Sequence, residues 1–194
     1  WSLGTDTGVN HEVVKVDLWN TASQIVSVMT NELTVSDNTV VFNGTADQTF
    51  SGLACIDESG NWGWPSDNSK TYVFTGHIEA TDSAKVYPYI GYIDGSNVSV
   101  WSNTAVDLNE DNNYSEDFYI SGGEVPAGMY MLIGYVVEDS TPETVITATN
   151  NEFYYEYETW GAQKWTAEND LPGLGITEDI AYNAYTVVLA DEVT

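Results

Sequence analysis

The stretch that decides the fold class of this 194-residue chain is Met129-Tyr130-Met131-Leu132-Ile133-Gly134-Tyr135-Val136-Val137. Its β-branched and aromatic residues favour a strand, and apolar residues occupy both alternating faces, so we expect both faces to be buried. The stretch Tyr89-Ile90-Gly91-Tyr92-Ile93 is similar to the Leu132–Val136 part of the first. A glycine inside each strand predicts a β-bulge or a close approach of another backbone segment.

Outward from these two stretches, hydrophobic residues alternate with a period of two along nearly the whole chain. Ser36-Asp37-Asn38 separates two β-branched runs, and Asp94-Gly95 lies between two apolar runs, so each predicts a β-hairpin. No window carries a sustained helical stripe, and residues 166–170 form the best short helix candidate. We therefore predict an all-β fold, either an Ig-like or a jelly-roll β-sandwich.

The chain ends suggest a simple domain organisation, with residues 1–10 as an N-terminal arm and residues 11–194 as a single β-sandwich domain. Trp1 and Leu3 are spaced to face the same side of an extended segment, so we expect them to contact a neighbouring subunit. A glycine-containing loop at 161–175 precedes the final apolar run at 181–190, which makes that run a candidate for an exchanged terminal strand.

Charge excludes several classes of partner. The chain has 30 Asp and Glu residues against four lysines, without arginine, and its formal net charge is −26. Binding phosphate requires Lys and Arg, so we expect no nucleic-acid partner. No apolar run approaches the roughly 20 residues of a membrane span, and we expect no membrane insertion. The acidic surface repels itself and requires salt, cations or packed neighbours for screening.

Several features favour an extracellular or cell-surface location. Three sequons, at Asn43, Asn97 and Asn113, fall in turn-like segments suited to glycosylation. The single cysteine, Cys55, lies in an apolar run and is expected to be a buried core thiol, with an intermolecular disulfide as the alternative. A salt-loving source organism would give the same acidic composition, and the sequence does not separate these two causes.

Oxygen-bearing side chains recur at alternate positions between residues 107 and 117, a spacing typical of a loop that wraps calcium. The candidate ligands are Asp107, Asn109, Asp111, Ser115 and Asp117. An EF-hand is excluded, because Asn112 replaces the required glycine, Phe118 replaces the bidentate glutamate, and flanking helices are absent. A solvated acidic turn is the interpretation that we favour, and calcium, the one cofactor that the chain suggests, is the alternative.

Tryptophans provide a candidate carbohydrate-binding platform. Trp62, Trp64 and Trp101 could stack against the apolar faces of sugar rings, while Asp and Asn side chains bond the hydroxyl groups. The interpretation that we favour is that they anchor the core or a subunit contact, where their large area is best used, and the platform is the alternative.

Residues 124–130, Glu-Val-Pro-Ala-Gly-Met-Tyr, resemble the Pro-Ala-Gly-x-Tyr turn that leads into a strand in many extracellular β-sandwich modules. Such modules include adhesin, surface-layer and carbohydrate-binding domains. The resemblance supports this class of module. Three further observations favour a structural, non-enzymatic subunit of a filament, sheath or surface layer, which polymerises with copies of itself: few lysines and no arginine, abundant aromatic residues, and terminal segments that could leave the domain. Two alternatives remain: a carbohydrate-binding module of a secreted protein, and a glycoside hydrolase that uses two carboxylates, although nothing selects the pair.

Overall fold

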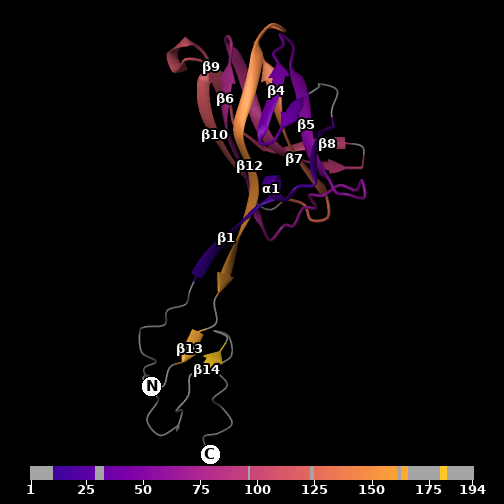
Figure 1. Cartoon of the computed structure of the whole chain (residues 1–194), viewed down its shortest axis with the longest axis vertical. Coiled ribbons are helices and arrows are strands. Elements are labelled where there is room, and N and C mark those ends of the chain that lie inside the picture. The colour runs from indigo at the N-terminus through magenta and orange to yellow at the C-terminus, as the bar shows by residue number, and fades with distance from the viewer. Residues whose placement is uncertain are drawn as a thin grey trace, which may run out of the picture. The chain divides into compact units, whose positions relative to one another are not determined.

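The structure of the chain is a computed structural model that describes residues 11–28, 33–95, 97–122, 125–160, 163–165 and 180–182. The chain divides into two compact units (Figure 1). One unit comprises Lys15–Glu156, and the other comprises Trp1–Val14 together with Tyr157–Thr194. Within the described residues, no helix is long and apolar enough to cross a membrane.

The Lys15–Glu156 unit is a sandwich of two antiparallel sheets, which we call sheet A and sheet B. Sheet A contains β1 (His11–Asp17), β3 (Thr34–Ser36), β4 (Thr39–Asn43), β6 (Thr71–Ala80), β10 (Ser115–Gly122) and β12 (Val145–Trp160). Sheet B contains β2 (Gln24–Ser27), β5 (Thr49–Ile56), β7 (Ala84–Asp94), β8 (Asn97–Asn103), β9 (Val106–Leu108) and β11 (Tyr130–Glu138). A one-turn helix α1 (Leu18–Thr21) follows β1, and a 3₁₀ turn η1 (Glu110–Asn112) follows β9.

The strand order identifies which kind of sandwich the sequence forms. Sheet A has the order β10-β6-β12-β4-β3, with β1 also paired to β12, and sheet B has the order β2-β5-β11-β7-β8, with β9 also paired to β7. From β4 to β7, and again from β10 to β12, successive strands alternate between the two sheets. The predicted all-β sandwich is confirmed, and of its two expected forms the order is that of a jelly roll.

Both predicted hairpins are present. Strands β3 and β4 pair around Asp37, whose φ of 53° lies in the left-handed region. Strands β7 and β8 pair from Asp94 and Asn97, and Gly95 supplies the positive φ of 62° that the turn requires. Local turn chemistry therefore sets the register of these two strand pairs, as the sequence indicated.

Strand β11 lies at the centre of sheet B and is buried on both faces, which confirms the prediction from its composition. Met131, Ile133 and Tyr135 point into the main core between the sheets, whereas Leu132 and Val136 belong to a second apolar cluster on the outer face of sheet B. The expected core thiol is also confirmed, because Cys55 is buried within the main core.

The two glycines singled out in the sequence have the two predicted roles. The pairing of β7 with β8 shifts register between Ile90 and Gly91, as expected of a bulge. A side chain at Gly134 would meet the carbonyl oxygen of Ser51 and, at 2.6 Å, the hydroxyl of Tyr89. Gly134 therefore permits the close approach of its neighbours on both sides.

In the second unit, β13 (Gln163–Trp165) pairs antiparallel with β14 (Ile180–Tyr182), so that Lys164 faces Ala181. Trp1, Leu3, the helix candidate at 166–170 and most of the run at 181–190 lie outside the described residues. The N-terminal arm, the exchanged strand and the proposed boundary at residue 10 therefore remain predictions.

Candidate functional site

The outer face of sheet B, which we call the sheet B face, differs from an ordinary solvent-exposed sheet surface. Antiparallel pairing places Val136 opposite both Phe50 on β5 and Tyr87 on β7. Directly paired residues point to the same side of a sheet, so these three side chains share the outer face. Ten large hydrophobic side chains are exposed among the described residues, and five of them lie on this face or at its edge: Phe50, Trp62, Val98, Val100 and Tyr130.

A cavity of about 410 Å³ is hollowed into the sheet B face across four strands. It is lined by Gln48, Phe50, Tyr87, Tyr89, Val100, Asn103, Val136 and Glu138. Aromatic and aliphatic side chains predominate in this lining. The polar side chains in it are the amides of Gln48 and Asn103 and the carboxylate of Glu138. Small-molecule sites typically have this composition, with an apolar bed and a few polar groups that fix orientation.

Tyr89 forms the rigid floor of this cavity. Its ring lies beside Gly134, and its hydroxyl donates a hydrogen bond of 2.8 Å to the carbonyl oxygen of Ser51 on β5. The side chain is fully buried, and burial raises the pKa of Tyr89 well above its ordinary value, so the phenol stays neutral. The floor is therefore held in place across three strands before any ligand arrives.

Polar groups stand at one end of the cavity. The Gln48 amide donates a hydrogen bond to the Glu138 carboxylate, and Lys85 lies opposite Glu138 in the strand pair. The Lys85 ammonium is 5.3 Å from the centre of the Tyr87 ring, within the range of a cation–π contact. Asn103, opposite Tyr89, adds an amide on the β8 side. These groups could donate to and accept from the hydroxyl groups of a ligand.

Trp62 and Tyr130 form an exposed aromatic pair at the other end of the sheet B face. Their ring centres are 6.4 Å apart, and the side chains are 37% and 42% exposed. Isolated bridges join Trp62 to Ile56 and Tyr130 to Pro65, so both backbones are tied to the sandwich. Exposed aromatic rings in a fixed position provide contact area at low cost in conformational entropy.

An aspartate orders the turn that leads into Trp62. The Asp57 carboxylate accepts hydrogen bonds from the backbone N–H groups of Ser59 and Asn61, at 2.9 and 2.8 Å. These bonds, with that of Asn61 first, lower the pKa of Asp57, which keeps the carboxylate ionised. This is an Asx-type turn, in which a short acidic side chain replaces backbone partners.

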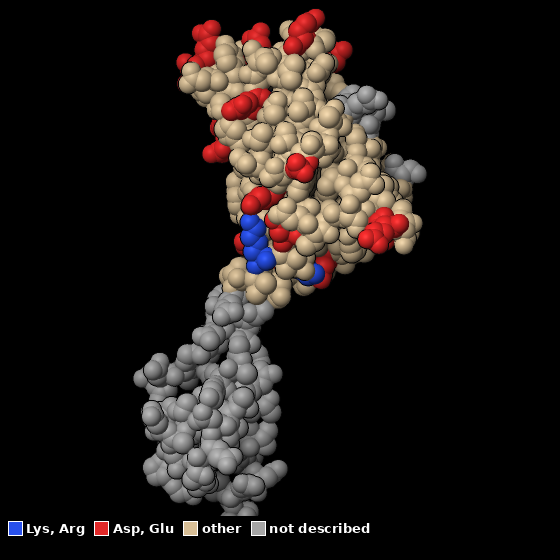
Figure 2. Space-filling view, in the orientation of Figure 1, with Lys and Arg blue, Asp and Glu red and all other residues tan. Residues whose placement is uncertain are grey.

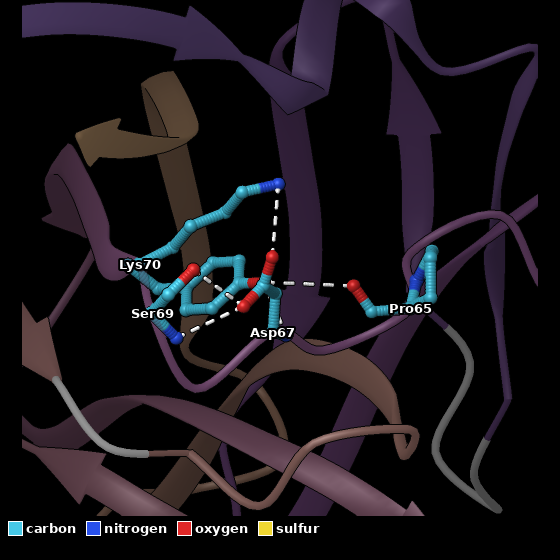
Figure 3. A network of polar contacts seen from close by, with 5 residues as sticks. Pro65, Asp67, Ser69 and Lys70 are labelled. Atoms are coloured by element: carbon cyan, nitrogen blue, oxygen red, sulfur yellow. Dashed lines mark hydrogen bonds and ion pairs between the residues drawn. The ribbon is translucent and has the colours of Figure 1, made fainter. Parts of the chain in front are cut away.

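A second aspartate fixes the end of the same loop (Figure 3). The Asp67 carboxylate accepts bonds from the backbone N–H and hydroxyl of Ser69, at 2.9 and 2.6 Å, and lies 3.5 Å from the Lys70 ammonium. The backbone N–H of Asp67 donates to the hydroxyl of Tyr72, which donates in turn to the Pro65 carbonyl. Tyr72 is a core residue, so this network fastens the tryptophan-bearing loop to the core.

The structure gives Trp64 the role that its sequence context favoured. Only 3% of this side chain is exposed, its ring centre lies 5.0 Å from that of Phe153, and its Nε1 donates to the carbonyl oxygen of Leu18. A ring this deeply buried cannot stack on a sugar, so Trp64 anchors the core, as the favoured interpretation holds.

Trp101 lies in a third environment. It is 38% exposed on β8, its ring centre is 6.1 Å from that of Tyr92, and its side chain adjoins Gly122 of sheet A. The three tryptophans thus lie in three different environments, each with its own aromatic neighbour. Trp62 is the one that joins the sheet B face.

Among the predicted calcium ligands, the side-chain oxygen of Asn109 is already bonded within its own turn, and Asp107 and Asp111 contribute backbone groups to that turn. Asn109 accepts a bond from the backbone N–H of Asp111, and Asn112 bonds the backbone of both Asn109 and Asp107. These contacts form a capping box around η1. Among the described residues, no group of three or more His, Cys, Asp or Glu side chains is placed to hold a metal ion. Calcium binding remains a prediction.

Ser115 and Asp117, the last two predicted calcium ligands, contact His77 of β6. Asp117 Oδ1 lies 2.6 Å from Nδ1 of His77, while Ser115 Oγ and Glu79 Oε1 lie 3.0 and 3.3 Å from Nε2. The hydrogen bond with Asp117, followed by that with Glu79, raises the pKa of His77. Two nearby carboxylates favour the imidazolium form, which cannot act as a general base.

The three sequon asparagines, Asn43, Asn97 and Asn113, are exposed in the structure. Asn43 ends β4, Asn97 begins β8, and Asn113 adopts the left-handed conformation after η1. Their positions leave room for a glycan, and glycosylation itself remains a prediction.

Comparison with known proteins adds a similarity in fold. No protein-family model matches the chain, and no curated protein matches it. Similar solved structures include a CBM4 carbohydrate-binding module (TM-score 0.45, 13% identity, covering 69% of this chain and 94% of that one). Another is the N-terminal cellulose-binding domain of Cellulomonas fimi β-1,4-glucanase C (TM-score 0.41, 11% identity, covering 76% of this chain and 95% of that one). A third is the arabinose-bound MgGH51 α-L-arabinofuranosidase (TM-score 0.44, 11% identity, covering 76% of this chain and 24% of that one). With identities and TM-scores this low, the likenesses do not indicate what this chain binds.

Proposed function

We propose that the sheet B face binds an uncharged glycan and that the chain is a carbohydrate-binding module of an extracellular protein. The observation that carries this proposal is the concentration of exposed aromatic and aliphatic side chains on one sheet face, around a cavity with Gln48, Asn103 and Glu138 at its edge. Aromatic rings can stack on the apolar faces of sugar rings, and the polar groups can bond their hydroxyls.

Charge supports an uncharged ligand in particular. On the outward positions of sheet B, the charged side chains are Lys85 and its two register partners, Glu138 on β11 and Asp107 on β9. The chain as a whole carries a formal charge of −26, so anionic glycans and phosphates are repelled. A second copy of the chain is repelled for the same reason, which argues against self-association as the use of this apolar face.

The other functions considered from the sequence have less support. The assembly subunit depended on Trp1, Leu3 and the terminal run at 181–190, which lie outside or largely outside the described residues. No contact between described residues favours a homopolymer, and no carboxylate pair among them is singled out for hydrolysis. The similar carbohydrate-binding structures agree with the proposal but do not carry it, since their TM-scores are low.

Isothermal titration with cellohexaose, xylohexaose and a β-1,4-galacto-oligosaccharide tests the proposal. Phe50→Ala removes an exposed ring from the cavity and should weaken binding of the best of these ligands about tenfold. The matched control is Tyr119→Ala, which removes a 62% exposed ring from the outer face of sheet A and should leave the affinity unchanged. Circular dichroism verifies that both variants fold.

Two outcomes would overturn the proposal. The first is that none of the three oligosaccharides binds the unaltered chain. The second is that light scattering finds a stable dimer that Phe50→Ala converts to a monomer, because the face would then be an interface between copies.

A further inference from the structure

Two aromatic groups occupy opposite ends of the sheet B face. Phe50 and Tyr87 flank Val136 at one end, and Trp62 lies beside Tyr130 at the other. Tyr130 and Val136 are on the same strand and the same face, six residues apart. With a rise of about 3.4 Å per residue, they are separated by roughly 20 Å along β11.

The residues between these two ends are uncharged. The outward residues of β11 along this path are Leu132 and Gly134, and those of β7 are Gly91 and Tyr89. Val98 and Val100 of β8 stand along one side and are each more than a third exposed. A ligand that follows β11 would therefore meet aromatic rings at its two ends and an apolar path between them.

We infer that the ligand is a linear, uncharged glycan of several sugar units that lies parallel to β11 and contacts both aromatic ends. This inference rests on the proposed function and specifies its ligand. A single sugar ring is too short to touch two groups separated by about 20 Å. A chain that touches one group presents its remaining units to the other at high effective concentration, so affinity grows with chain length.

The competing orientation is a glycan that crosses the strands. The cavity alone, lined from β5 to β8, would then hold the whole ligand. Such a ligand would depend on Phe50 and Asn103 and would be indifferent to Trp62 and Tyr130. The two orientations thus differ in one measurable respect, the contribution of the Trp62 end to the binding of long chains.

Titration of cellohexaose and cellobiose, and of the matching xylose series, distinguishes these orientations. Trp62→Ala should weaken the hexasaccharide about tenfold and the disaccharide less than twofold, whereas Phe50→Ala should weaken both. Trp62→Tyr keeps an exposed ring and should stay within about threefold of the unaltered chain, which separates loss of the ring from disturbance of the loop. Thermal melting of each variant monitors folding.

The inference fails if Trp62→Ala leaves hexasaccharide affinity unchanged, or if disaccharide and hexasaccharide bind equally well to the unaltered chain. In either case glycan binding in the cavity still stands, because Phe50→Ala reports on it independently. If no oligosaccharide of any length binds, the proposed function itself fails and this inference with it.

Discussion

The two outer faces of the sandwich follow the same rule of alternation but expose opposite chemistry. On sheet A the outward residues of β6 and β10 include His77, which bonds both Glu79 and Asp117. On sheet B the outward residues of β7 and β11 include Tyr87, Tyr89 and Val136, which form an apolar cluster. In Figure 2, carboxylates also gather at the upper end of the view, where turns join the strands.

The acidic side chains of the chain are therefore distributed unequally between the two outer faces. Of the carboxylates of this −26 chain, Glu79, Asp117, Glu152 and Glu156 lie at outward positions of sheet A, whereas an apolar cluster lies at the outward positions of sheet B. Exposed apolar surface of this extent usually marks a binding site. The contrast between the faces is therefore better evidence of function than either the net charge or any single motif.

The largest expected effect comes from filling the space at Gly134. Gly134→Ala would place a methyl group against the Ser51 carbonyl and 2.6 Å from the Tyr89 hydroxyl, and backbone cannot move aside as a flexible side chain can. We expect the free energy of unfolding to fall by about 2–3 kcal/mol, as measured by urea denaturation. Ser121→Ala, at an exposed position of sheet A, should change it by less than about 0.5 kcal/mol. A stable Gly134→Ala protein that binds glycans normally would show that the sheet B face is not the tightly preformed surface described above.

Local sequence signals were sufficient for the fold but not for the site. The composition of 129–137 predicted a strand buried on both faces, and Asp94-Gly95 predicted the hairpin of β7 and β8, because turn chemistry and alternation act within a few residues. The cavity depends on β5 meeting β11 and on β11 meeting β7, and the sequence contains no mark of which strands pair. Phe50, Tyr87 and Tyr130 were therefore missed as site residues. Their signal was an apolar residue at an outward position, which is visible only after the register is known.

The tryptophans show the same limit at closer range. Trp62 and Trp64 are two residues apart and look equivalent in sequence, yet one is exposed and the other is buried. Tertiary partners decide between them, since Phe153 and Leu18 receive Trp64 whereas Tyr130 adjoins Trp62. Likewise, the spacing of oxygens near Asp111 could not reveal that Asn109 already bonds the turn backbone.

A second prediction compares the inner and outer faces of sheet B through two buried tyrosines. The Tyr135 hydroxyl donates to Oδ1 of buried Asn151 at 2.6 Å, so Tyr135→Phe leaves a buried amide oxygen without that donor and should cost about 2 kcal/mol. The Tyr89 hydroxyl bonds the backbone oxygen of Ser51, and Tyr89→Phe should cost about 1 kcal/mol.

Urea denaturation and oligosaccharide titration together test this comparison. Tyr135→Phe should be the less stable variant but should bind glycans normally, because Tyr135 points into the core. Tyr89→Phe should be the more stable of the two and should bind more weakly, because loss of the hydroxyl bond to Ser51 releases the ring that forms the floor of the cavity. If Tyr135→Phe bound glycans more weakly and Tyr89→Phe bound them normally, the division between an inert inner face and a functional outer face would be wrong.

The smallest expected effect concerns the pH response of sheet A. Asp117 and Glu79 raise the pKa of His77 above its ordinary value of 6.5, while Ser115 is its uncharged neighbour. Because the folded-state pKa is raised, protonated His77 contributes stability that is fully present below about pH 6.5 and lost as pH rises through the folded-state pKa. His77 is 27% exposed, so solvent screening should hold the contribution below about 1 kcal/mol.

The measurement is the difference in unfolding free energy between the unaltered chain and His77→Gln across pH 5.5 to 8.5. Taking the difference cancels the contribution of the titratable groups that both proteins share. The advantage of the unaltered chain should shrink as pH rises, and added salt should reduce it further. Glycan affinity, which belongs to the other sheet, should not follow this difference. An advantage that grows with pH would mean that His77 is stabilised in its neutral form, and a matching change in glycan affinity would mean that the two faces are coupled after all.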